Sequence, residues 1–112
     1  MDFGLRQQDM DEIVRILHRF PVIEEAVLFG SRAKGTFKKG SDVDIAVKGK
    51  DIDHADVASL SFLLNEESAM PYFFDIIHFD EISEKELLAH INRVGRCLYS
   101  REKCVAGFFA RP

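Results

Sequence analysis

The sequence predicts an α/β (α+β) fold in which helices and strands alternate in the order αβαβαβα. Apolar residues recur every three or four positions in several segments, which is typical of amphipathic helices, and they alternate or run together in three shorter segments, which is typical of strands. Capping residues, Gly and Pro separate these segments. A chain of 112 residues can bury one core, so we predict one domain over residues 1–102 and an apolar tail at 103–112.

The first helix is predicted to begin at Asp9, because Glu12 stands three positions later and completes a capping box. Its apolar stripe consists of Ile13, Ile16, Leu17 and Phe20. Pro21 ends this pattern. The apolar run at 26–29 then predicts a first strand over 24–29.

A polar segment follows this strand. A short helix is predicted over 31–34, and the second strand over 42–47. Successive side chains of a strand point to opposite faces. One face of the second strand carries Val43, Ile45 and Val47, and the other carries Asp42, Asp44 and Ala46. We expect the first face in the core and the second at a functional site.

Two further helices flank a third strand. Asp53 predicts the N-cap of the first of them, which ends within 65–68, and the strand follows at 72–79. Ser83 and Glu86 form a second capping box before the last long helix. The apolar stripes of the two helices consist of Val57, Leu60 and Leu64, and of Leu87, Ile91, Val94 and Leu98.

Composition argues against two classes of function. The formal net charge is −4, whereas proteins that hold nucleic acid backbones cluster Lys and Arg. No apolar run approaches the ~20 residues of a membrane-spanning helix, and residues 1–9 lack the layout of a signal peptide. We therefore expect a cytoplasmic protein with no direct nucleic acid binding and no membrane contact. The two cysteines, Cys97 and Cys104, lack the spacing of a metal site.

Two chemical features share the segment between the first two strands. Gly30 and Ser31 stand where a strand end turns into a helix, and backbone N–H groups at such a turn favour phosphate. Asp42 and Asp44 are two positions apart, so both carboxylates of an extended strand project from one face and can share a metal ion. Asp75 adds a carboxylate inside a later apolar run, where an unpaired charge is costly.

This pattern resembles the nucleotidyltransferase superfamily that includes DNA polymerase beta, whose signature is Gly-Ser, a gap of ten residues and Asp-x-Asp, as between Ser31 and Asp42. Asp75 matches the third carboxylate of that superfamily. The segment Gly-Ser-Arg-Ala-Lys-Gly at 30–35 and the small size of the chain resemble the minimal nucleotidyltransferases, which are often encoded beside a HEPN-domain partner. The resemblance covers roughly the middle half of the chain. It implies the polymerase beta-like nucleotidyltransferase fold, with a small mixed sheet of three or slightly more strands.

The resemblance also implies a reaction, in which a nucleoside monophosphate, in the first place AMP from ATP, moves to an acceptor hydroxyl. The metal ligands would be Asp42, Asp44 and Asp75, and the ligands of the phosphates of ATP or another nucleoside triphosphate would be Gly30, Ser31 and Arg32. Two Mg²⁺ ions, or Mn²⁺, would be the cofactors, since both prefer oxygen ligands. Asp75 would also accept the proton of the attacking hydroxyl.

The acceptor and the mode of action stay open at this level. The resemblance suggests a tyrosine of a HEPN toxin, which would make the chain an antitoxin. An antitoxin of this fold can also mask its partner without catalysis, and related enzymes modify small molecules. The three acids favour retained chemistry, because a pure binding module needs no converging carboxylates. We expect a single domain to obtain its acceptor site from an open cleft, a hetero-complex or a homo-oligomer. The tail residues Val105, Phe108 and Phe109 are a candidate docking surface, and the alternatives are that they pack on the last helix or are disordered.

Overall fold

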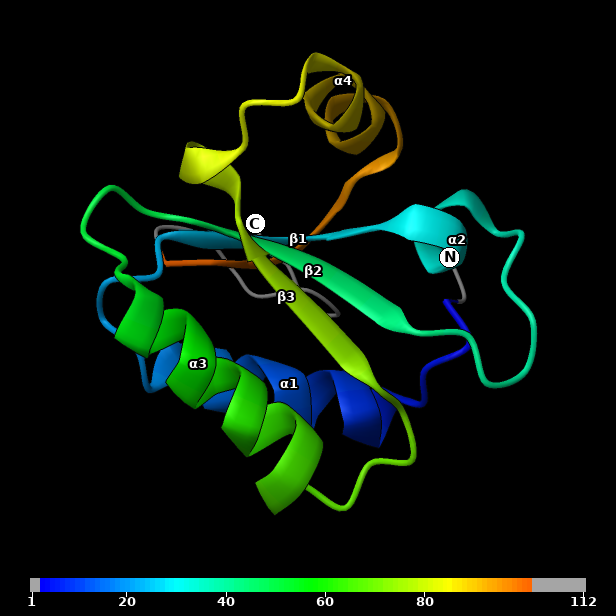
Figure 1. Cartoon of the computed structure of the whole chain (residues 1–112). Coiled ribbons are helices and arrows are strands. Elements are labelled where there is room, and N and C mark those ends of the chain that lie inside the picture. Colours follow the sequence, from blue (N-terminus) through cyan, green and yellow to red (C-terminus); the bar gives the residue numbers. More distant parts are fainter. Residues whose placement is uncertain (1–2, 102–112) are drawn as a thin grey trace.

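The computed structural model describes residues 3–101 and shows a mixed sheet with helices on both faces (Figure 1). The helices are α1 (Gln7–His18), α2 (Gly30–Lys34), α3 (His54–Phe62) and α4 (Lys85–Val94), and the strands are β1 (Glu25–Phe29), β2 (Val43–Lys48), β3 (Phe74–His78) and β4 (Arg96–Ser100). A π-helical turn, Leu63–Glu67, extends α3, and a 3-10 turn, Phe79–Glu81, follows β3. None of the helices within residues 3–101 combines the length and the hydropathy that crossing a bilayer requires. The predicted tail at 103–112 lies outside the described residues.

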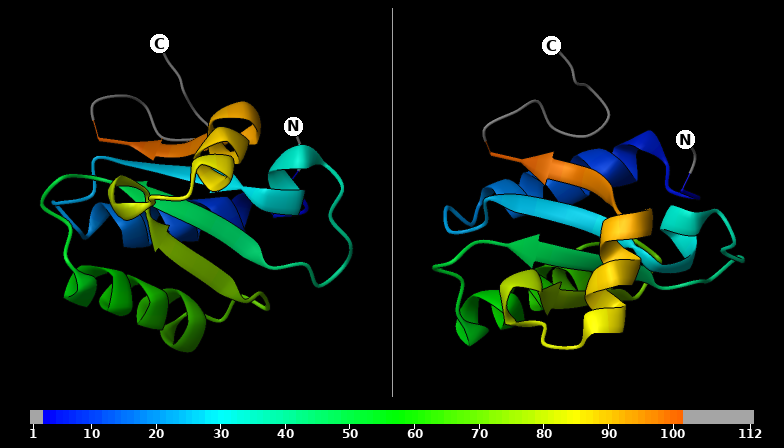
Figure 2. Two further views of the ribbon diagram at one scale, coloured as in Figure 1. Left: turned by 45° about the horizontal axis from the view of Figure 1, so that its top comes forward. Right: turned by 90° about the horizontal axis from the view of Figure 1, so that it is seen from above.

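Within residues 3–101 the sheet has four strands in the order β3-β2-β1-β4, so β3 and β4 form the edges of this described sheet. β1 pairs antiparallel with both β2 and β4, whereas β2 and β3 are parallel. α1 and α3 cover one face of the sheet, and α4 lies on the other (Figures 1 and 2). The predicted mixed sheet flanked by helices is confirmed, with one strand more than the apolar patterns indicated.

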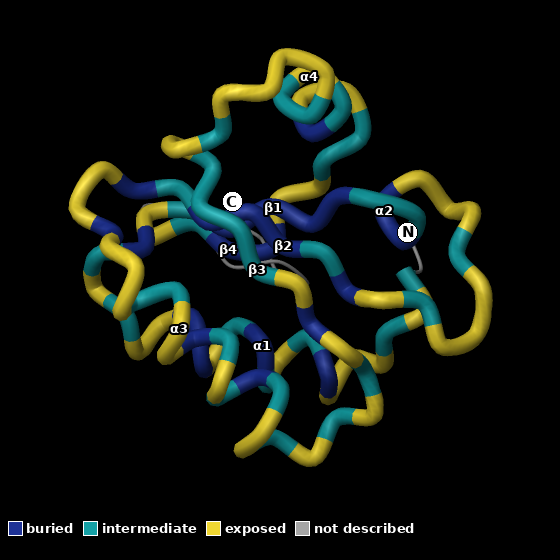
Figure 3. The backbone as a smooth tube through the Cα atoms, in the orientation of Figure 1, coloured by how far each residue is buried: buried dark blue, intermediate teal, exposed yellow. Residues whose placement is uncertain are grey.

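The core lies on both faces of the central strands β1 and β2, which are mostly buried (Figure 3). The larger cluster fills the space between the sheet and helices α1 and α3. A smaller cluster under α4 consists of Val27, Phe29, Ala46 and Ile91. We expected the whole Ala46 face of β2 to be a site, but α4 covers Ala46. The accessible part of that face is therefore the start of β2, where Asp44 is half-buried.

Of the predicted helix caps, only Asp53 is confirmed, since its carboxylate accepts a hydrogen bond from the Asp56 N–H at 2.9 Å. α1 begins before Asp9, and the Asp9 carboxylate lies in the first turn, where it accepts from the Arg6 N–H at 3.1 Å. The Ser83 cap is also wrong, because α4 begins one residue later without a side-chain cap. Acidic residues suit both the cap and the first turn of a helix, so composition alone leaves the start ambiguous by a few positions.

The prediction of one helix continuing through Leu98 is wrong beyond Val94. Gly95 leaves the helix in an extended conformation and packs so closely on the Ile91 carbonyl and on Val27 that a side chain would clash there. The chain then forms β4 along β1 and buries Leu98 in the core. Leu98 stands four residues after Val94, so a strand residue continued the helical period by coincidence.

Candidate active site

Asp44 and Asp75 lie side by side near the start of two neighbouring strands. β2 and β3 are parallel, and their register pairs Asp44 directly with Asp75. Paired residues of a sheet project to the same face, so both carboxylates point to the side that α4 partly covers. Asp42 precedes Asp44 by two positions and lies just before β2 begins, close enough for its charge to act on Asp44. The fold thus places Asp44 beside Asp75, although α3 separates them along the chain.

The electrostatics of the site centre on Asp44, which is half-buried, whereas Asp42 and Asp75 are exposed. Burial raises the pKa of the Asp44 carboxyl, and the nearby charges of Asp75 and Asp42 raise this pKa further. The charge of Arg32 lowers the pKa of Asp44. A bound cation would relieve the repulsion among the carboxylates, so the arrangement suits a positively charged ligand.

The surroundings of Asp75 differ from the prediction. We expected its carboxylate among apolar side chains, but Asp75 is exposed because β3 is an edge strand. Its neighbour Phe74 is buried on the other face of the sheet, while Phe73 is 59% exposed. The charge of Asp75 therefore needs no buried partner, and its carboxylate is accessible to an incoming substrate.

Gly30 brings the turn after β1 into contact with Asp44. The register of β1 and β2 pairs Phe29 with Asp44, and Gly30 follows directly. Its φ of 75° lies in the left-handed region, and a β-carbon at Gly30 would overlap Oδ2 of Asp44. Glycine is required here both by the backbone conformation and by the close approach. Ser31, half-buried, is the next residue of α2, so the turn predicted to bind phosphate lies beside the acids.

Arg32 is buried, with 2% of the residue exposed. Its Nε and Nη2 donate to the Ser41 carbonyl at 3.1 and 2.8 Å, and Nη1 donates to the Phe3 carbonyl at 2.8 Å. The rings of Phe37 and Tyr72 lie over the guanidinium, with centroids 5.2 and 5.1 Å from Cζ. Three of its N–H donors are thus engaged with backbone carbonyls, and the role of Arg32 as a phosphate ligand stays a prediction.

Arg32 connects the segments that carry the acids. Its hydrogen-bond acceptor Ser41 immediately precedes Asp42, and its ring contact Tyr72 lies three residues before Asp75. A guanidinium with several fixed donors can hold such loops in one arrangement. The sequence indicated a role in the site for this arginine. Its contacts with Phe3 and Tyr72 could not be predicted, because these residues are distant in the chain and no local motif links them to Arg32.

A second buried polar group supports the same region. Asp9 is 2% exposed, and its Oδ2 accepts a hydrogen bond from the Tyr72 hydroxyl at 2.8 Å. The Arg6 guanidinium donates to both Asp9 oxygens at 3.0 and 3.1 Å, and these hydrogen bonds hold the pKa of Asp9 below its ordinary value. Sequence reasoning missed this link between α1 and the segment before β3, because it treated Asp9 only as a helix cap.

The chemistry of the acids fits Mg²⁺, which takes oxygen ligands. Among residues 3–101, no three His, Cys, Asp or Glu side chains lie close enough together to hold one metal ion as they stand. Mg²⁺ is usually bound through one or two carboxylates together with substrate phosphates, rather than in a complete protein cage. The pairing of Asp44 with Asp75, and the exposure of Asp42, suit that mode of binding.

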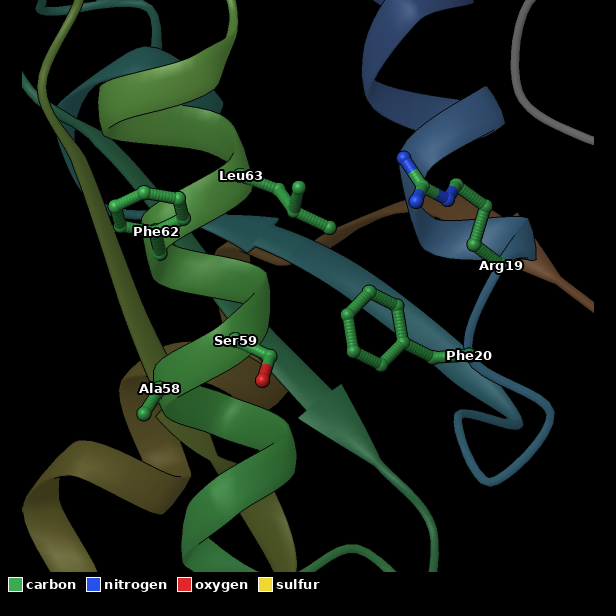
Figure 4. A pocket seen from close by; sticks show the side chains of 6 residues that line it. All are labelled: Arg19, Phe20, Ala58, Ser59, Phe62 and Leu63. Atoms are coloured by element: carbon green, nitrogen blue, oxygen red, sulfur yellow. The ribbon is translucent and has the colours of Figure 1, made fainter.

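The pocket in Figure 4 lies between the C-terminal end of α1 and α3, away from the acids. Its lining consists of Arg19, Phe20, Ala58, Ser59, Phe62 and Leu63. This lining contains no carboxylate, so the pocket offers no ligands for a divalent ion. We assign the chemistry to the acids instead.

Comparison with known proteins decides the family. Residues 11–104 match the family described as Polymerase beta, Nucleotidyltransferase. The chain belongs to this family. Within a nucleotidyltransferase, the paired strands β2 and β3 and the turn after β1 are the elements that carry the predicted signature. A comparison with curated protein sequences gave no significant match.

Solved structures share the fold of this nucleotidyltransferase. A chain of a toxin–antitoxin crystal structure with AMP-PNP has a TM-score of 0.69 and 26% identity, covering 84% of this chain and 75% of that chain. A chain from the structure of the complex between the tri-AMPylated Shewanella oneidensis HEPN toxin and MNT antitoxin has a TM-score of 0.66 and 23% identity, covering 88% of this chain and 75% of that chain. A chain of the toxin–antitoxin MntA-HepT has a TM-score of 0.65 and 23% identity, covering 87% and 74%. The predicted fold and the likeness to minimal nucleotidyltransferases are confirmed.

Proposed function

We propose that this nucleotidyltransferase transfers AMP from ATP to a protein hydroxyl, and that the acceptor is a tyrosine of a HEPN-domain partner. The register that pairs Asp44 with Asp75 carries the proposal, since it places two acids of the family signature on one face beside the Gly30 turn. Modification of the tyrosine adds a phosphate charge and bulk to the partner. The chain then acts as an antitoxin by neutralising that partner.

The choice of nucleotide and acceptor is supported by the structural neighbours. The toxin–antitoxin that is 26% identical to this chain was crystallised with AMP-PNP, an analogue of ATP. The HEPN toxin in another neighbour is tri-AMPylated and bound to an MNT antitoxin, but that neighbour is 23% identical and its likeness shows the fold alone. The identity of the acceptor is therefore the part of the proposal that experiment must decide.

Each residue of the candidate site has its own role in the proposed transfer of AMP. The acceptor oxygen attacks the α-phosphorus of ATP, the bond between that phosphorus and the bridging oxygen breaks, and pyrophosphate leaves. Asp75, exposed at the sheet edge, accepts the proton of the attacking hydroxyl. Asp42, Asp44 and Asp75 would hold two Mg²⁺ or Mn²⁺ ions, which supply positive charge against the transferring phosphate. The turn at 30–31 faces the triphosphate with backbone N–H groups and the Ser31 hydroxyl.

Arg32 has a positioning role in this proposal. Its hydrogen bonds to the Ser41 carbonyl fix the backbone immediately before Asp42. Transfer depends on placing the acids and the reacting atoms accurately, because positioning supplies much of the catalysis of phosphoryl and nucleotidyl transfer.

Intact-mass measurement tests the proposed function. The co-expressed HEPN partner is incubated with this chain, ATP and Mg²⁺, and we expect its mass to increase by one or more AMP units. Asp42→Asn should abolish the increase, and Asp51→Asn, an exposed acid outside the site, should preserve it. A tight complex that neutralises the partner with no increase in mass would contradict transfer and establish masking instead.

A further inference from the structure

The outer edge of β3 carries main-chain groups that no other strand of the described chain pairs. Among the strands within residues 3–101, only β2 hydrogen-bonds to β3. The Phe73 carbonyl accepts from the Val43 N–H at 2.9 Å, so residues 73, 75 and 77 direct their backbone groups toward β2. The backbone groups of residues 74, 76 and 78 point outward by the same alternation. In Figure 1, β3 lies at the front of the sheet, with α3 below it and α4 above.

Asn65 already occupies the first outward position. Its side-chain amide donates from Nδ2 to the Phe74 carbonyl at 2.9 Å, and its Oδ1 accepts from the Phe74 N–H at 2.7 Å. The amide thus makes the two hydrogen bonds that a residue of an added strand would make. At the next outward position, Ile76, no loop, helix or side chain within residues 3–101 contributes a hydrogen bond to the backbone.

A groove runs beside this edge. Its volume is about 550 Å³. One wall comes from α3, through Val57, Ala58 and Ser61, and the other from the β3 edge itself. Glu81, on the turn after β3, and Asp75 also line the groove. We call this feature the β3 groove; it is continuous with the acid cluster through Asp75.

We propose that the β3 groove receives an extended, basic segment of the acceptor protein, which adds to β3 as a further strand. Unpaired N–H and C=O groups along a sheet edge are the chemistry that recognises an extended main chain. The carboxylates of Asp53, Asp75 and Glu81 along the groove attract Lys and Arg side chains of such a segment. The assignment of this segment to an acceptor rests on the proposed function, whereas the docking of a basic strand does not.

Strand addition would also position the acceptor hydroxyl. Residues paired across a sheet project to the same face, so the residue of the bound segment opposite Asp75 lies on the face where Asp75 carries its carboxylate. Its neighbours opposite Phe74 and Ile76 project to the other face, toward the wall formed by Val57 and Ala58. The groove therefore selects a segment in which a hydroxyl residue stands between apolar residues, with basic residues nearby.

Peptide binding tests this proposal without depending on transfer. A designed fluorescent peptide with a tyrosine between apolar residues and lysines beside them is titrated with the full chain, in the absence of nucleotide and divalent metal, and anisotropy is recorded. Overlapping fluorescent peptides that together cover the HEPN partner are titrated in the same way. We expect a basic peptide with a hydroxyl residue between apolar residues to bind. Ile76→Pro removes an outward N–H without removing a hydrogen bond between β2 and β3, although it also replaces a side chain that packs on the core. Glu81→Lys reverses a charge of the groove. Each should weaken binding about tenfold, equivalent to about 1.4 kcal/mol.

The control is Glu67→Lys, which makes the same charge change at an exposed position that does not line the groove. It should bind the peptide like the original chain, and circular dichroism of all three variants checks that the fold is retained. Binding of no peptide, or equal binding by Glu81→Lys and Glu67→Lys, would overturn the docking proposal. Peptide binding without any transfer of AMP would support docking and would overturn the proposed function separately.

Discussion

Gly30 and Asp44 are packed so closely that a β-carbon at Gly30 would clash with the Asp44 Oδ2. The contact joins the two halves of the family signature, since the turn that would hold phosphate rests on the carboxylate that would hold metal. Because Gly30 also has a φ of 75°, its replacement strains the backbone as well as displacing Asp44.

Gly30→Ala is expected to abolish transfer and to lower the free energy of unfolding by about 1–3 kcal/mol. Gly35→Ala is the matched control, because Gly35 has a φ of 85° but a β-carbon added there would meet no atom within 4 Å. Gly35→Ala should lower the free energy of unfolding only through the strained backbone, and it should keep its activity. Equal activity of the two variants in the intact-mass assay would show that contact with Asp44 is not needed.

Asp44→Asn is expected to raise the stability of the metal-free chain at pH 7 while abolishing transfer. The pKa of Asp44 is raised in the fold, chiefly by burial and then by Asp75 and Asp42, so folding favours its protonated form. The stability that this group contributes is present at low pH and is lost as pH rises through the folded pKa. Asn carries no charge at any pH, so the difference between variant and original should shrink in acid.

Melting temperatures measured from acid to neutral pH check this sign. We expect the variant to melt a few degrees higher at pH 7 and the two curves to converge at low pH. Asp51→Asn, at an exposed site away from the cluster, should show no such difference. A lower melting temperature of Asp44→Asn at pH 7 would mean that the ionised carboxylate stabilises the fold.

Arg32→Met is expected to destabilise the chain by about 2–4 kcal/mol, because several hydrogen bonds of a buried charged group are lost together. Lys34→Met, two positions later on the same short helix and exposed, should change stability little. Urea unfolding measures the first effect. Calorimetry with ATP and Mg²⁺ measures nucleotide affinity, and the intact-mass assay measures the transfer rate. A positioning role predicts that Arg32→Met lowers the transfer rate more than it lowers the nucleotide affinity. Unchanged stability with lost ATP binding would instead make Arg32 a phosphate ligand.

The sequence predicted the parts of the site that are local in the chain. Gly30, Ser31, Asp42 and Asp44 lie within one strand–turn–strand unit, so their spacing alone indicated that they meet. Asp75 was found through the family pattern, and its exposure was missed because strand order was unknown: the same apolar run would be buried in a central strand. Position in the sheet, rather than composition, decided its environment.

The roles of Arg32 and of β4 depended on long-range packing. The guanidinium contacts Phe3 and Tyr72, which lie on either side of it at large sequence separation, and no local motif indicates such a pairing. Leu98 stands at a spacing that also fits a continuation of α4. Only the pairing of residues 96–100 with β1 shows that this segment is a strand and not a helix. Periodicity identifies which residues are buried more reliably than it identifies the element that buries them.

The number of divalent ions bound with nucleotide tests the central claim most directly, namely that the three carboxylates form one metal site. Electron paramagnetic resonance of Mn²⁺, titrated into the chain with a non-hydrolysable ATP analogue, measures that number independently of any acceptor. We predict two Mn²⁺ ions per chain for the original sequence, loss of one for Asp75→Asn, and loss of nucleotide-dependent binding for Asp44→Asn. Identical Mn²⁺ binding by the original chain and both variants would contradict the claim.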